Sequence, residues 1–77
     1  MHWELWSIDT ANLVGTCDTE AEGFALVREL VGKGWPVDTL SLMVEDESRP
    51  VETLPPAVSG ADLARRAGLT GTARRSA

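Results

Sequence analysis

The residues that could carry nucleophilic or metal chemistry are few and widely spaced. His2 is the single histidine and Cys17 the single cysteine in the 77 residues. A Ser-His or Cys-His nucleophile needs a base within hydrogen-bond reach, and a zinc site needs several such ligands at short spacing. We expect neither, because His2 lies near a terminus that should fray. Cys17 is interpreted as a small hydrophobic residue on a strand.

Three consecutive acidic residues, Glu45 to Glu47, are the remaining candidate for ligand chemistry. They lack the ligand spacing of a calcium loop and fall where we expect a hairpin turn, which favours a solvated charge cluster. Gly32 and Gly34 follow a predicted helix, whereas a phosphate-binding glycine loop precedes one. We therefore predict that the protein is not an enzyme, has no catalytic residues and holds no cofactor or metal.

Charge is divided unevenly along the chain, whose formal net charge is -5. Residues 1–60 contain eleven acidic and three basic side chains, whereas residues 61–77 contain one acidic and four basic. An acidic body repels phosphate backbones and favours basic protein surfaces. The apolar runs are too short to cross a bilayer, and the first residues lack the basic region of a secretory signal. We expect a soluble cytoplasmic protein without a membrane partner.

The elements that position these residues follow from turn, capping and periodicity signals. Residues 3–17 are predicted to form a β-hairpin around the turn "DTAN". The run "DTEAEGFALVRELVGKG" predicts a helix that begins after Thr19, with Glu22 completing a capping box. "TLSLMVE" alternates as a strand should, and "PVETL", residues 50–54, is predicted as the fourth strand, with Pro50 at its start.

These elements predict an α+β domain over residues 1–69. Hairpin pairing and a helical crossover give a four-stranded antiparallel sheet of order 2-1-3-4. One long helix should cover one face of the sheet, with Gly23 allowing close approach, and a short helix should follow the fourth strand.

The C-terminal run "DLARRAGLT" resembles the first helix and turn of helix-turn-helix regulators. The second helix would be "GTARRSA", which has no apolar side chain beyond two alanines and ends too soon to enter a major groove. We predict instead a helix over Ala61–Ala67, with a capping box between Ser59 and Asp62, and a disordered basic tail over 70–77. Nucleic-acid binding is not our first expectation, but it stays open as an alternative for a basic arm made of Arg65, Arg66, Arg74 and Arg75.

The runs "NLVGTCDTEAEGFALVREL", "LSLMVEDE" and "GADLARRAG" are together similar to a group of small, uncharacterised bacterial proteins. These proteins follow the order hairpin, capped helix, hairpin and short terminal helix. The resemblance covers roughly residues 3–68 and implies this fold, but no activity and no site residues.

Three tryptophans are many for so short a chain, and one helix cannot shelter all of them. Trp3 and Leu5 should point to one face of the first strand, and Trp6 and Ile8 to the other. We therefore predict a protein-interaction module, with a small regulator or an antitoxin-like accessory protein as one form of it. A homodimer is the expected assembly. The candidate interface residues are Trp3, Trp6, Trp35 and Met43.

Overall fold

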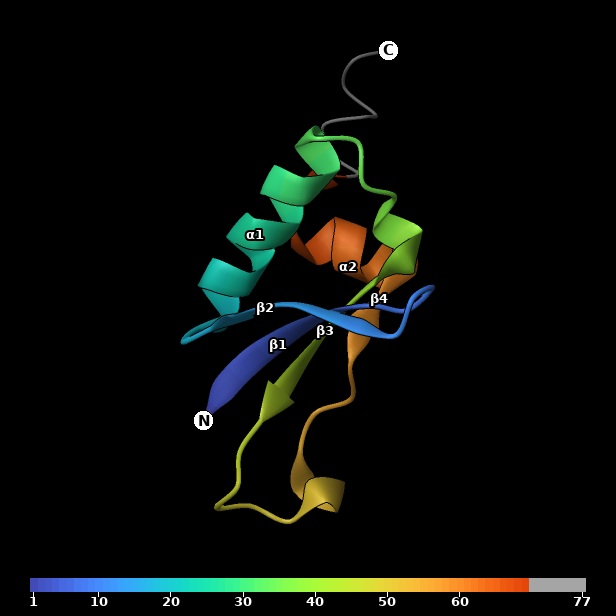
Figure 1. Ribbon diagram of the computed structural model, residues 1–77. Coiled ribbons are helices and arrows are strands. Elements are labelled where there is room, and N and C mark those ends of the chain that lie inside the picture. Colours follow the sequence, from blue (N-terminus) through green and yellow to red (C-terminus); the bar gives the residue numbers. More distant parts are fainter. Residues whose placement is uncertain (70–77) are drawn as a thin grey trace.

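The computed structural model describes residues 1–69, and the tail predicted over 70–77 lies outside the described residues. The elements in chain order are β1 (His2–Ser7), β2 (Asn12–Cys17), α1 (Glu20–Gly32), β3 (Leu40–Glu45), β4 (Val58–Ser59) and α2 (Gly60–Arg66), with single 3-10 turns at η1 (Val37–Thr39) and η2 (Val51–Thr53). The strands form one antiparallel sheet of order β2-β1-β3-β4 (Figure 1). The predicted α+β fold and strand order are confirmed.

The first hairpin forms as predicted, with a four-residue turn between β1 and β2. The turn residue with a left-handed backbone is an alanine. Ala11 has the positive φ, at 55°, and Asn12 already belongs to the strand. A side chain with a Cβ is strained in this region, so the turn costs more with alanine than it would with glycine.

Helix α1 begins at the predicted capping box. The backbone N–H of Glu22 donates to the Thr19 hydroxyl at 3.1 Å, and the Glu22 carboxylate accepts from the backbone N–H of Thr19 at 3.3 Å. Val27 and Leu30 are buried on the inner side of the helix, and Phe24 packs against the same core. The helix is therefore fixed at its start by the cap and along its length by its apolar side.

Gly23 brings α1 close to the sheet, as its place in the apolar arc predicted. A Cβ at this position would lie 2.9 Å from Cδ1 of Leu42 on β3, and Leu42 is fully buried. The contact leaves no room for a larger residue at this turn of the helix.

Both helices pack on the same face of the sheet (Figure 1). Side chains from both helices and three strands meet in one core, whose buried members are Leu5, Val27, Leu30, Leu40, Leu42, Val58, Leu63 and Ala67. Leu63 and Ala64 of α2, and Ala67 directly after it, are buried. The opposite face of the sheet receives neither helix.

The predicted fourth strand at residues 50–54 is wrong, and so is the capping box at Ser59. Residues Val51–Thr53 form η2, in which the N–H and the hydroxyl of Thr53 both donate to the Pro50 carbonyl. Pro55 and Pro56 have no N–H for a ladder, so pairing with β3 begins only where Val58 reaches Leu42.

Helix α2 starts at Gly60, one residue earlier than predicted, and ends at Arg66. Ser59 has extended backbone but its side chain caps no helix N–H. Asp62 was expected to complete that cap, yet its carboxylate binds Arg65 and Arg66 instead. Gly68, just after the helix, has a φ of 83°, in the left-handed region that favours glycine at a helix end.

Candidate functional site

The candidate site is the sheet face that neither helix covers, called here the open face. Successive residues of a strand alternate between faces, and the buried Leu5 and Ser7 assign the inner side of β1. The outer positions of β1 are therefore occupied by His2, Glu4 and Trp6. Cross-strand pairing places Ser41 opposite Trp6, Met43 opposite Glu4, and Leu13 of β2 on the other side of Trp6. By the same pairing Thr16 lies opposite Glu4 and Glu45 opposite His2, so the open face consists of His2, Glu4, Trp6, Leu13, Thr16, Ser41, Met43 and Glu45.

A chain of hydrogen bonds runs along β1 on this face. The indole N–H of Trp6 donates to Oε1 of Glu4 at 3.0 Å, and Nε2 of His2 lies 3.0 Å from Oε2 of the same carboxylate. The bond from His2, then the bond from Trp6, lowers the pKa of Glu4 below its ordinary value. Glu4 is 19% exposed at its side chain, so its ionised form is held close to the sheet by two partners.

A β-bulge brings Leu13 to the open face. Leu5 pairs with Gly15, but the next residue, Trp6, pairs with Leu13, so Val14 has no partner of its own on β1. Val14 packs against the core instead, while Leu13 stays 47% exposed beside Trp6. Without the bulge, Trp6 would pair with Val14, and Leu13 would point to the other face of the sheet. The sequence pattern of "NLVGTC" did not reveal it.

The structure separates the four predicted interface residues. Trp6 and Met43 lie together on the open face. Trp3 lies on the inner side of β1, where it packs against the core beneath the helices. Trp35 follows α1 in the connection to β3 and is 38% exposed. Leu13 and Glu4, which sequence reasoning did not select, complete the surface around Trp6.

The structure places His2 differently from the sequence expectation, and Cys17 as expected. His2 is part of β1, opposite Glu45 on β3, rather than on a frayed end. Cys17 is on a strand as predicted, half-buried opposite Trp3. Burial, followed by the charges of Glu22 and Asp18, raises the pKa of its thiol, which disfavours the reactive thiolate.

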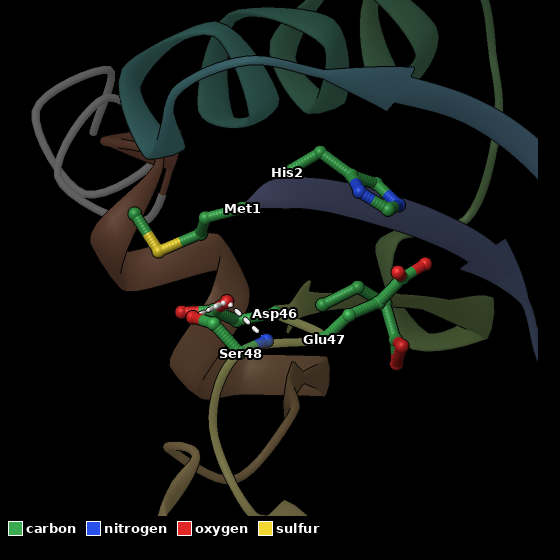
Figure 2. A pocket seen from close by; sticks show the side chains of 6 residues that line it. Met1, His2, Asp46, Glu47 and Ser48 are labelled. Carbon is green, nitrogen blue, oxygen red and sulfur yellow. Dashed lines mark hydrogen bonds between the residues drawn. The ribbon is translucent and has the colours of Figure 1, made fainter.

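A shallow hollow of ≈ 310 Å³ lies beside the His2 end of the open face. Figure 2 shows Asp46 and Ser48 joined by hydrogen bonds, with Met1 and His2 nearby at the start of the chain. These bonds, the one from the Ser48 hydroxyl foremost, lower the pKa of Asp46. The acidic turn is thus stabilised by hydrogen bonds from Ser48 to Asp46. No group of three metal-ligating side chains occurs within residues 1–69.

The basic residues proposed for a nucleic-acid arm are divided between α2 and the tail. Arg65 binds Asp62 through Nη2, and Nε of Arg66 lies 3.3 Å from the other carboxylate oxygen of Asp62. Arg74 and Arg75 lie outside the described residues. The Asp62 carboxylate thus forms ion pairs with both arginines of α2.

Comparison with protein-family models, curated proteins and solved structures finds no match to this chain, so the resemblance to a bacterial group stays an expectation. Within the described part of the chain, none of the helices has the length and apolar character needed to cross a membrane.

Proposed function

We propose that the protein is a non-enzymatic protein-interaction module whose docking surface is the open face, and that this face pairs first with a second copy of the chain. The observation that carries the proposal is the placement of both helices on one side of the sheet. Trp6, Met43 and Leu13 lie on the other side of the sheet, which neither helix covers. A domain usually buries such a surface against another layer or a partner.

The polar groups at the centre of the open face are suited to burial. Both oxygens of Glu4 already have partners in the same strand, Trp6 on one side and His2 on the other. A partner that covered the face would remove water without leaving this carboxylate unsatisfied.

A second copy is the partner that the arrangement favours. The apolar groups lie on the central strand β1 and on its two neighbours, so a two-fold contact between two open faces would bury Trp6, Met43 and Leu13 of one copy against the same surface of the other. Two-fold contacts of this kind are the commonest assembly of small soluble proteins. A different protein could use the same face, and it would then compete with self-association.

The acidic charge of the chain indicates which kind of different protein could bind the open face. Glu45, Asp46 and Glu47 follow one another at the end of β3, next to the His2 end of the open face. An apolar patch bordered by basic residues would complement this surface. A small regulator or an antitoxin-like accessory protein is a role of this type. The nucleic-acid alternative gains no support from α2, where Asp62 pairs with Arg65 and Arg66.

Sedimentation equilibrium of matched variants tests the proposal. Met43→Lys places a cation opposite Glu4, which favours the folded chain but opposes burial of the face. Since the substitution occurs twice in a two-fold dimer, a loss of ~1.4 kcal/mol at each position raises the dissociation constant about a hundredfold. Val51→Lys is the control, because Val51 is 81% exposed on η2. A wild-type chain that stays at 8.3 kDa up to ~100 µM, or equal dissociation constants for both variants, would reject self-association.

A further inference from the structure

Ser41 of β3 is almost completely buried, although it lies on the open face. It is 8% exposed, and strand pairing places it between Trp6 of β1 and Ser59 of β4. Its neighbours Leu40 and Leu42 belong to the core, so the Ser41 side chain points away from both helices. A hydroxyl is thus enclosed on the side of the sheet that neither helix covers.

The Ser41 hydroxyl has no hydrogen-bond partner among residues 1–69. Within these residues no side-chain oxygen or nitrogen is both shielded from solvent and unpaired, so the Ser41 oxygen still reaches the surface. Ser7, the other buried polar residue of the described chain, already accepts a hydrogen bond from the Thr10 hydroxyl at 3.0 Å. A serine hydroxyl donates one hydrogen bond and accepts two, so the capacity of Ser41 is unused.

Ser41 differs in this respect from Glu4 and Thr16, which also lie on the open face. Both oxygens of Glu4 have partners on β1. Thr16 is exposed on the edge strand β2, where water still reaches it when the middle of the sheet is covered. A partner that covered Ser41 without pairing its hydroxyl would bind about five- to a hundredfold more weakly. The hydroxyl therefore selects among partners by the group that they place next to it.

A second copy of the chain has groups that can satisfy this hydroxyl. The hydroxyls of Thr16 and Ser59 are exposed, have no partner within the described residues, and lie on the same side of the sheet as Ser41. A two-fold contact between two such surfaces brings these hydroxyls toward the other copy. A group that pairs with Ser41 in one direction then does so in the other, and the dimer gains both hydrogen bonds.

We propose that Ser41 determines which partner the open face accepts, because its enclosed hydroxyl forms a hydrogen bond with the second copy. The inference rests on the proposed self-association and adds to it the polar contact that gives the interface its specificity. Trp6 and Met43 provide apolar area, which tolerates many complementary shapes. Ser41 instead requires a donor or an acceptor at one place, opposite Trp6 on the neighbouring strand.

The two buried serines give the test a matched pair of variants, measured by sedimentation equilibrium and by urea unfolding of dilute, monomeric protein. Ser41→Ala should raise the dissociation constant of the dimer about thirtyfold, because one hydrogen bond is lost in each copy. It should leave the unfolding of the monomer unchanged. Ser7→Ala, on the inner face, should do the reverse. It loses the bond from Thr10, so the unfolding equilibrium constant of the monomer rises about fivefold while the dissociation constant stays within about twofold.

Equal dissociation constants for wild type and Ser41→Ala would overturn the role of Ser41 and leave the open-face interface in place. A tighter dimer of Ser41→Ala would show that the hydroxyl stays unpaired when it is covered. A monomer destabilised as much as Ser7→Ala would assign the Ser41 hydroxyl to the fold of a single chain, and either result overturns the proposal. A wild-type chain that stays monomeric would reject the proposed self-association itself, and this inference with it.

Discussion

The indole N–H of Trp6 donates to Oε1 of Glu4, two residues earlier on the same strand, at 3.0 Å. Residues two apart on a strand point to the same face, so the bond places a large aromatic ring and an ionised carboxylate side by side on the open face. It also holds the N–H edge of the indole against the Glu4 carboxylate. The rest of the ring can then contact a partner.

Trp6→Phe should lower the free energy of unfolding by about 1 kcal/mol, because it removes the N–H donor to Glu4 while keeping an aromatic ring. It should also move the pKa of Glu4 back toward the ordinary value. Urea unfolding of dilute protein and a carboxyl-carbon NMR titration measure the two effects. Trp35→Phe is the control, since no hydrogen bond of the Trp35 indole occurs within residues 1–69.

The Glu4 network should make stability fall in acid. Because the pKa of Glu4 is lower in the folded chain, its ionised form contributes stability above the unfolded value near 4.5, and this contribution is lost as the pH falls through the folded value. The charged groups nearest to it are His2 on its own strand and Glu45 opposite His2 on β3; the residues directly opposite Glu4 are uncharged.

Glu4→Gln should remove this part of the pH dependence. The difference in unfolding free energy between wild type and Glu4→Gln should be constant near neutrality and shrink below about pH 4.5. Asp46→Asn is the comparison variant for a carboxylate outside the network. The pKa of Asp46 is also lowered, but its hydrogen-bond partner is Ser48 in a turn. If the difference in unfolding free energy between wild type and Glu4→Gln grows as the pH falls, the hydrogen bonds of Glu4 with His2 and Trp6 do not stabilise the folded chain in this way.

Gly23→Ala and Gly32→Ala should have opposite effects, although both replace a glycine of α1. Alanine favours a helix by up to about 1 kcal/mol over glycine. At position 23 its Cβ would meet Cδ1 of the buried Leu42 at 2.9 Å, and overpacking costs about 1–3 kcal/mol. At position 32 an added Cβ would meet no atom within 4 Å beyond the adjacent residues and the backbone of its own helix. Thermal unfolding should therefore give a net loss for the first variant and a gain of ~0.5 kcal/mol for the second.

Ala11→Gly should raise the stability of the folded chain by about 0.5–1 kcal/mol, because Ala11 has a φ of 55° in the hairpin turn. Ala25→Gly, at an exposed position inside α1, should lower it by about 1 kcal/mol. Denaturant midpoints measure both changes. A loss of stability in Ala11→Gly would show that the turn does not adopt this backbone conformation.

Local signals were sufficient to predict most of the fold. Two of these signals depend only on neighbours within a few residues. They are the cap formed by Thr19 and Glu22, and the alternation of Leu40, Leu42 and Val44. The error at 50–54 arose because a β-like composition also permits a 3-10 turn after Pro50. The position at which β4 joins the sheet is set by the pairing of Val58 with Leu42, two residues that are far apart in the sequence.

The candidate site was predictable only in part. Alternation correctly separated Trp3 from Trp6, and Met43 from Leu42. The contribution of Leu13 depends on a bulge at Val14, and the pairing of Glu4 with Trp6 depends on side-chain rotamers. The sequence also left open which face α2 would cover. Its packing beside α1 follows from Leu63 and Ala67, which join the same core.

The most direct measurement of self-association through the open face is an isotope-filtered NOE experiment on a mixture of two preparations. One contains ¹³C-labelled methionine methyl groups, and the other is unlabelled. The interface proposed here predicts intermolecular cross-peaks from the Met43 methyl to the Trp6 indole or the Leu13 methyls of the other copy. Their absence at concentrations where the chain sediments as a dimer, or intermolecular peaks confined to Met1, would contradict it.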